Sequence, residues 1–184
     1  MRRFKIILGI ALAAVVFAAC GDDGGSSTAS AAGGFNDADV TFTQGMIPHH
    51  EQAIEMSELA LDPKAGASAK TKDVATRIKQ AQDPEIKTMR GWLQAWAKSE
   101  MAADMAGHSM TGMMSATEMT ALAKLTGTQF DRSWAEMMIK HHQGAIEMAN
   151  TVKKSGKNAD VRKVAEQIAA TQTAEITELQ ALIK

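Results

Sequence analysis

Apolar side chains recur at intervals of three and four residues over most of the chain, which is the period of an amphipathic α-helix. This pattern predicts a first helix from Asp37 to about Leu61, which Pro63 brings to an end. A polar stretch, residues 64–71, leads to a second helix that carries apolar residues as far as Trp96. Strand signals are absent, because β-branched runs are few and no Asn-Gly turn occurs.

Three more helices are predicted in the second half of the chain, at about 116–125, 128–154 and 159–184. Ser115 and Glu118 form a capping box that opens the short helix, and Gly127 closes it. Asn158 has the side chain of an N-cap for the last helix. Pro48 and Pro84 fall inside the first two helices, and each is expected to bend or interrupt its helix.

One short stretch occurs twice, as residues 46–56 and 138–148, in the shared frame Met, Ile, His, His, Ala, Ile, Glu and Met. The two copies contain four of the five histidines, which are His49, His50, His141 and His142. The likeness continues into the helices that follow, where Glu85-Ile86 aligns with Glu175-Ile176. A whole helical hairpin is therefore duplicated.

Two such hairpins predict an all-α fold, an antiparallel four-helix bundle with internal pseudo-two-fold symmetry. The bundle is expected to occupy residues 37–184. Its repeats cover about 37–98 and 128–184, and a Met-rich linker, residues 99–127, joins them.

The start of the chain has the pattern of an export signal. Three cations precede an apolar run that is too short to span a membrane, so residues 1–19 read as a signal peptide. The run ends in Phe17-Ala18-Ala19-Cys20, which resembles a bacterial lipobox, and Cys20 is the expected site of lipidation. The alternative is an ordinary cleaved signal with a free cysteine. Residues 20–36 then form a flexible tether on a lipoprotein of the cell envelope, anchored to the outer face of the cytoplasmic membrane, or periplasmic.

Charge and cysteine content exclude several classes of function. Removal of residues 1–19 leaves 17 Lys and Arg against 21 Asp and Glu, and such a balance gives no basis for binding nucleic acid. Cys20 is the only cysteine, so the bundle has neither a disulfide nor a thiolate metal site. Any soft metal ligand must come from another side chain.

The repeated motif offers such ligands as methionine and histidine. Met46 lies one helical turn before His49 and His50, and Met138 stands in the same relation to His141 and His142. Thioether sulfur with neutral imidazole suits Cu(I) and its analogue Ag(I) rather than Mg²⁺ or Ca²⁺. The alternative is that these histidines only pack and hydrogen-bond inside the bundle.

Two glutamates, Glu55 and Glu147, are candidates to orient the imidazoles from the opposite hairpin, or else to form ion pairs at the surface. Met56 and Met148 are expected in the core, or in a layer that faces the linker, because they lie too far along the helix to share an ion with the histidines.

The linker is rich in methionine and contains no Leu, Ile, Val or Phe between residues 101 and 119. Its six methionines are Met101, Met105, Met110, Met113, Met114 and Met119. With His108, the methionines Met110, Met113 and Met114 could capture Cu(I) and close it over the histidine sites, with Gly107 and Gly112 giving the arm freedom to move. The alternative is an apolar strap that merely covers the bundle.

Other chemistry that helical bundles support is disfavoured. Carboxylate-bridged di-iron sites need a Glu three residues before a His, and no such pair occurs here. No Ser or Cys accompanies the histidines as a nucleophile. We therefore expect a protein that is not an enzyme, with a copper-dependent oxidoreductase as the alternative.

The motif copies and their surroundings, such as Met138-Ile139-x-His141-His142-Gln143-Gly144-Ala145-Ile146, closely resemble the bacterial family called domain of unknown function 305 (DUF305) over residues 37 to 184. The resemblance implies a ferritin-like helical bundle, and exported members rich in Met and His are associated with copper and silver binding and tolerance. It favours an exported protein that buffers or relays Cu(I) or Ag(I), with a copper exporter or a metallochaperone as its protein partner. The alternative is a metal-free interaction or structural module of the envelope.

Overall fold

The computed structural model describes residues 34–101 and 110–184, all of which belong to one unit of the chain, residues 31–184. Within these ranges the chain forms helices and no strand. The helices are α1 (Asp37–Leu61), the 3-10 helix η1 (Pro63–Ala65), α2 (Ala69–Ala95), α3 (Ala116–Leu122), α4 (Gly127–Ser155) and α5 (Ala159–Leu182). The signal peptide, Cys20, Met105 and His108 lie outside the described residues.

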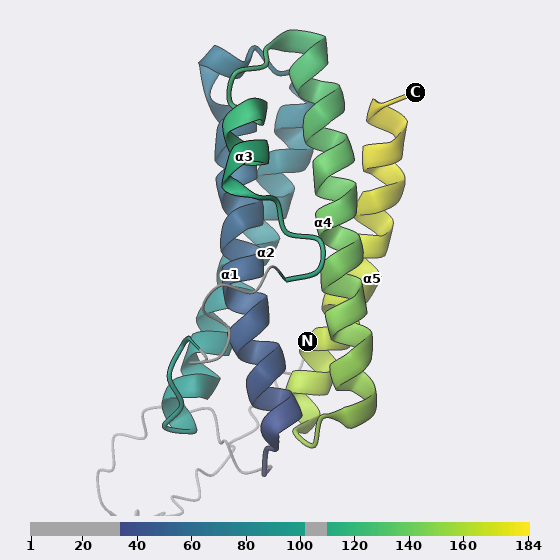
Figure 1. Ribbon diagram of the computed structural model, residues 1–184. Helices are drawn as coiled ribbons and strands as arrows, with labels where there is room; N and C mark the ends of the chain where they lie inside the picture. Colours follow the sequence, from purple (N-terminus) through teal and green to yellow (C-terminus); the bar gives the residue numbers. More distant parts are fainter. Residues whose placement is uncertain (1–33, 102–109) are drawn as a thin grey trace, which may run out of the picture. The chain divides into compact units, whose positions relative to one another are not determined.

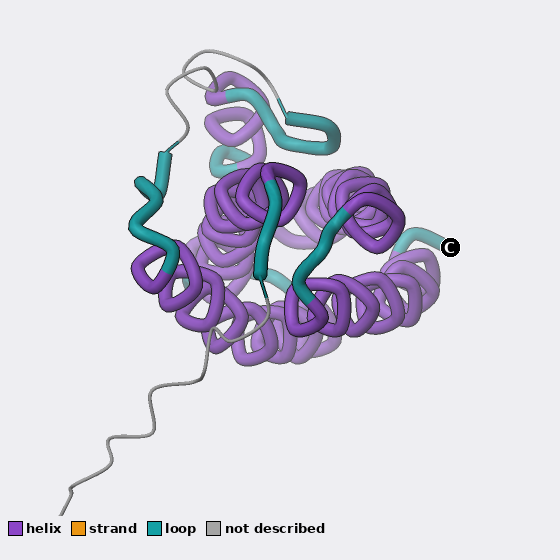
Figure 2. The backbone as a smooth tube through the Cα atoms, turned by 90° about the horizontal axis from the view of Figure 1, so that it is seen from below, coloured by secondary structure: helices purple, strands orange, loops and turns teal. Residues whose placement is uncertain are grey.

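Two antiparallel hairpins, α1 with α2 and α4 with α5, make the most extensive helix contacts. They join mainly through α1 and α4, which run in opposite directions side by side (Figure 1). Figure 2 looks along the helices and shows the four long helices together, with the described parts of the connection between α2 and α4 on the outside. The predicted all-α, antiparallel four-helix bundle is confirmed.

Local sequence accounts for most helix ends. Asn36 caps α1 in a capping box with Asp39, and the predicted box of Ser115 and Glu118 opens α3. Asn158 caps α5 through the backbone N–H groups of Asp160 and Val161, as predicted. Each cap accepts hydrogen bonds from backbone donors that a helix N-terminus leaves unpaired.

The structure differs from the predicted helix ends and interruptions at several places. Neither α1 nor α2 is interrupted at its proline, Pro48 or Pro84, because the buried face on each side of the proline keeps its partners across the bundle. The short helix α3 ends at Leu122 rather than near Leu125. Gly127 does not close it but forms the first residue of α4, with a positive φ of 59°.

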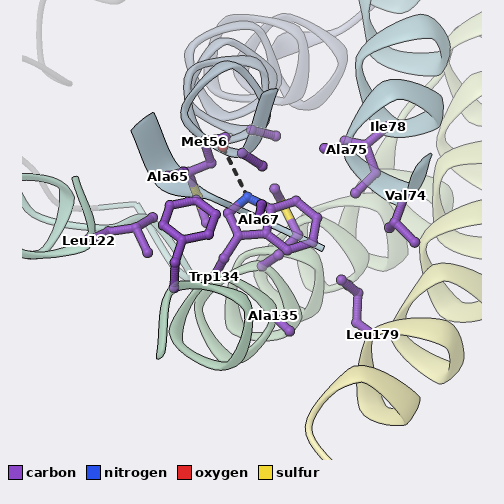
Figure 3. Close-up of a cluster of buried hydrophobic side chains, with 14 of the residues drawn as sticks. Met56, Ala65, Ala67, Val74, Ala75, Ile78, Leu122, Trp134, Ala135 and Leu179 are labelled. Carbon is purple, nitrogen blue, oxygen red and sulfur yellow. Dashed lines mark hydrogen bonds between the residues drawn. The ribbon is translucent and has the colours of Figure 1, made fainter. Parts of the chain in front are cut away.

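The hydrophobic core consists of two separate clusters of buried residues. The first, shown in Figure 3, surrounds Trp134, whose indole Nε1 donates a hydrogen bond to the carbonyl of Met56 over 2.9 Å. The second surrounds Met46, Met89 and Ala149 near the start of α1 and the end of α4. Along each long helix the two clusters are separated by a few residues, and those residues form the candidate site.

A buried carboxylate ties the two hairpins together at one end. Asp39 is fully buried, and its Oδ2 accepts hydrogen bonds from the backbone N–H groups of Asn36, Lys157 and Asn158 at 2.9 to 3.0 Å. The start of α1 is thereby joined to the turn between α4 and α5. Among the helices that the structure describes, none is both long and apolar enough to cross a membrane.

Candidate metal centre

Between the two hydrophobic clusters lies a layer of polar side chains, two from each long helix. They are His49 and His50 from α1, Gln82 and Glu85 from α2, His141 and His142 from α4, and Gln172 and Glu175 from α5. The two hairpins contribute them at equivalent repeat positions, so the layer follows the pseudo-two-fold symmetry of the chain. All four histidines are completely buried.

His49 and His141 face each other where α1 meets α4. Their ring centroids are 3.8 Å apart and the rings are tilted by 40°. Burial, followed by repulsion from His50, lowers the pKa of His49 from 6.5 to about 3. Burial and the neighbouring His49 also hold the pKa of His141 well below 6.5. Both rings are therefore neutral at physiological pH, the form in which imidazole binds metals.

Each of the other two histidines is paired with a glutamate of its own hairpin. His50 Nε2 lies 2.8 Å from Glu85 Oε2, and His142 Nε2 lies 2.8 Å from Glu175 Oε2. A carboxylate only accepts, so Nε2 carries the hydrogen of each pair. The structure corrects the prediction for Glu55 and Glu147. Both are exposed on the outer faces of α1 and α4, and the orienting carboxylates come from the second helix of each hairpin.

Five buried ring nitrogens of these histidines have no hydrogen-bond partner among the described residues. They are Nδ1 of His49, His50 and His142, and both nitrogens of His141. Buried polar atoms are nearly always satisfied in folded proteins, so a group of five in one layer makes this layer the candidate site for a bound ion or water.

Residues 110–114, here called the strap, cross the bundle outside α1 and α4 (Figure 1). The carbonyl of Thr111 lies 3.3 Å from His49 Nε2. Gln52 of α1 pairs with the backbone of Met114 through two hydrogen bonds, accepting from its N–H over 2.7 Å and donating to its carbonyl over 2.8 Å. The strap is thus attached to α1 on both sides of Gly112.

On α4 the strap rests against backbone. A Cβ atom built on Gly144 would lie 2.7 Å from the carbonyl carbon of Thr111 and nearer still to its oxygen. Gly112 has a φ of +86°, and a Cβ there would lie 2.8 Å from the carbonyl oxygen of Lys140. The structure corrects the expectation that Gly112 frees the linker, because this glycine allows close packing instead.

The predicted methionine ligands divide into two groups. Met46 and Met138 are fully buried one turn from the histidines, but they lie in different hydrophobic clusters, on opposite sides of the polar layer. Of the strap methionines, Met114 is buried, while Met110 and Met113 are half-buried.

The last methionines of the two motif copies have different surroundings. Met56 lies in the core. Met148 shares a groove of about 440 Å³ between α1 and α4 with Met110 and Thr111 of the strap, so it faces the linker.

Across the described ranges, no group of three or more His, Cys, Asp and Glu side chains is arranged to hold a metal ion. The arrangement at His49 and His141 can instead supply two neutral nitrogens, with thioether sulfur one turn away on each helix. Two or three soft ligands of this kind suit a monovalent ion of copper or silver and not a hard divalent ion.

Sequence reasoning found the four histidines but missed Glu85 and Glu175, which hold His50 and His142, and Gln52, which holds the strap. A signal for the glutamates was present, because the repeat alignment sets Glu85 opposite Glu175 on helices that must pack against the motif. No comparable signal pointed to Gln52, since its repeat equivalent is a glycine, Gly144.

Comparison with known proteins supports a common fold and a common family. Residues 39–183 match the profile of the family described as Domain of unknown function (DUF305). The chain is similar to a DUF305 protein of known structure from Streptomyces coelicolor, described as a candidate secreted protein. The two share 30% sequence identity, the match covers 79% of this chain and 91% of that one, and the TM-score is 0.74. Among curated protein sequences there is no significant match to the chain.

Two further similar structures are of CopM with copper bound. The Cu(I)-bound form has 33% sequence identity over 78% of this chain and 93% of that one, with a TM-score of 0.64. The Cu(II)-bound form has 34% identity over 79% and 95%, with a TM-score of 0.68. CopM has also been solved with silver bound.

Proposed function

The chain belongs to the DUF305 family, and from that premise we propose that it binds a soft monovalent ion, Cu(I) or Ag(I), in the layer between its two hydrophobic clusters. His49 and His141 are the central ligands. Met46 and Met138 supply thioether sulfur from the adjacent turns. The binding of copper and silver by CopM, a similar protein, supports this choice of ions.

One observation carries the proposal: five buried ring nitrogens without partners sit among four histidines. In the neutral ring His49 presents Nδ1, because the Thr111 carbonyl accepts from its Nε2. His141 presents either nitrogen. A bound ion would take up lone pairs that otherwise stay desolvated and unpaired.

His50 and His142 have a supporting part in this proposal. Their bonds to Glu85 and Glu175 fix the ring orientation and direct Nδ1 away from the carboxylate. These two histidines can accept the ion after the central pair or tune the charge around it. The strap methionines Met110, Met113 and Met114, with His108, are proposed to deliver the ion, although His108 lies outside the described residues.

The biological role that fits such a site is buffering, relay or tolerance of the ion, without catalysis. We further propose that the protein is exported and lipidated at Cys20, consistent with the similar Streptomyces protein being described as a candidate secreted protein. A copper exporter or a metallochaperone is then the proposed partner. The alternative function is a metal-free module of the envelope whose histidines only pack.

An anaerobic competition titration with a coloured Cu(I) chelate decides between these functions. Residues 34–184 are suitable, since they contain the whole range that matches the family, residues 39–183. We expect the wild-type protein to bind Cu(I) with a dissociation constant well below one micromolar. His49→Ala/His141→Ala should raise that dissociation constant at least tenfold. A variant with Met110, Met113 and Met114 changed to Leu tests delivery separately.

Circular dichroism of each variant verifies that the bundle remains folded. Micromolar or weaker binding by the wild-type protein, or indifference to both variants, would refute the proposal and favour the metal-free module. A loss confined to the strap variant would move the site from the histidines to the linker.

A further inference from the structure

The strap contacts both copies of the motif at the same repeat position. Gln52 lies six residues after Met46, and Gly144 lies six residues after Met138. Gln52 clasps the backbone of Met114 with two hydrogen bonds, while Gly144 leaves the space that Thr111 and Gly112 occupy. The two repeats therefore differ at this position because the same segment, the strap, hydrogen-bonds to one copy and packs closely against the other.

At its midpoint the strap lies directly over the central histidines. Thr111 touches the His49 ring through its carbonyl, and Gly112 packs against the backbone of Lys140 and His141. Both imidazoles are completely buried. The strap is thus the part of the site's wall that is not formed by a helix.

We infer that the strap gates access to His49 and His141, and that Gln52 and Gly144 are the positioning residues that hold it closed. As a statement about metal uptake, this inference rests on the proposed function. Opening the strap breaks the two Gln52 bonds and the weaker Thr111 contact and takes Met114 out of the first hydrophobic cluster, whereas separating α1 from α4 would break contacts along two long helices. The strap is the part of the wall that costs least to move.

Closing the strap also sets the chemistry of the site. With Thr111 in place, its carbonyl accepts from His49 Nε2 and leaves Nδ1 as the donor atom toward an ion. When the strap lifts, either tautomer of His49 is allowed. Gln52 therefore acts through Thr111, and removing its bonds should speed entry and exit of the ion more than it changes the equilibrium affinity.

The test compares Gln52→Leu, which removes both bonds at similar side-chain volume, with Gln143→Leu, which changes an exposed glutamine within the other motif copy. Gln52→Glu keeps the acceptor for the Met114 N–H but loses the donor. We expect Cu(I) transfer from a coloured chelate to be about tenfold faster in Gln52→Leu, the effect of losing two ordinary hydrogen bonds. Gln52→Glu should be intermediate, and Gln143→Leu should match wild type.

A second readout needs no metal. Diethylpyrocarbonate modifies accessible neutral histidines, and peptide mass spectrometry resolves the two motif copies. We expect modification of His49 and His141 to accelerate in Gln52→Leu by a factor similar to the copper rate. If Gln52→Leu fails to fold, Gly144→Ala displaces the strap sterically and replaces it.

The outcomes separate the two proposals. Equal rates in wild type and Gln52→Leu by both readouts would overturn the gate, whether or not copper binds. Faster modification without any copper uptake by wild type would refute the proposed function while upholding the strap as the barrier to the histidines. Faster copper transfer that tracks faster modification supports both.

Discussion

Replacing Gly144 with alanine should destabilise this protein, although alanine is the better helix former. Gly144 lies within α4, where Gly→Ala ordinarily adds about 0.5 to 1 kcal/mol of stability. Here the new Cβ would lie 2.7 Å from the carbonyl carbon of Thr111 and 2.9 Å from the Cα of Gly112. Both neighbours are backbone atoms, so neither can rotate out of the way.

The size of the effect follows from what must move. Carbon atoms are in favourable contact at about 3.5 to 4.0 Å and the Thr111 oxygen would lie nearer still to the new Cβ, so the strap must retreat by at least about 1 Å. Such a shift weakens the two Gln52 bonds and the Thr111 contact, each worth about 0.5 to 1.5 kcal/mol. After the gain in helix propensity is subtracted, we expect a net loss of about 1 to 3 kcal/mol, or about 3 to 10 °C in Tm.

Gly91 provides the matched control. It lies in α2, is exposed, and has no atom within 4 Å of a built Cβ. Gly91→Ala should therefore raise the free energy of unfolding by about 0.5 to 1 kcal/mol. Urea and thermal unfolding followed by far-UV circular dichroism measure both variants. If Gly144→Ala were as stabilising as Gly91→Ala, the close packing of the strap on α4 would be refuted.

Three further predictions concern the ends, the charge and the ligand of the bundle. Asp39→Ala removes the acceptor of three backbone N–H groups and should cost about 2 to 4 kcal/mol in urea unfolding; a change below about 1 kcal/mol would contradict the junction described for it. Because burial lowers the pKa of His49 from 6.5 to about 3, the unfolded chain gains a proton that the folded protein does not as the pH falls below 6.5. Stability should drop by about 2 kcal/mol between pH 7 and pH 5 from His49 alone, with His141 acting in the same direction, and a flat profile would disagree. Finally, Ag(I) at 100 times its dissociation constant should raise the free energy of unfolding by about 2.7 kcal/mol, seen as a rise in Tm that His49→Ala/His141→Ala abolishes.

Periodicity and caps were enough to predict the helices because both are local. The apolar face of each helix is written at spacings of three and four residues, and Ser115 and Asn158 satisfy backbone donors within three residues of themselves. An interruption at Pro48 and Pro84 was expected because the loss of one hydrogen bond is a local cost, but both helices continue. Whether packing across the bundle outweighs that cost depends on the neighbouring helices, so the sequence of the helix alone does not predict it.

The candidate site was only partly predictable. A repeated pair of histidines could be recognised in the sequence, but the carboxylates that hold His50 and His142 depend on the register between helices of a hairpin. Glu55 is near in sequence yet points to solvent, while Glu85 is 35 residues away from His50 and touches it. The clasp by Gln52 depends on the path of the linker, which no periodicity describes.

The different residues at the position shared by Gln52 and Gly144 bear on how the chain arose. A dimer of two identical hairpins would need the same residue in both copies, and it would have no connecting segment to accommodate. In the single chain one linker contacts both copies. It hydrogen-bonds to Gln52 of the first copy and packs against Gly144 of the second. The difference between Gln52 and Gly144 is thus a consequence of joining two repeats through one linker.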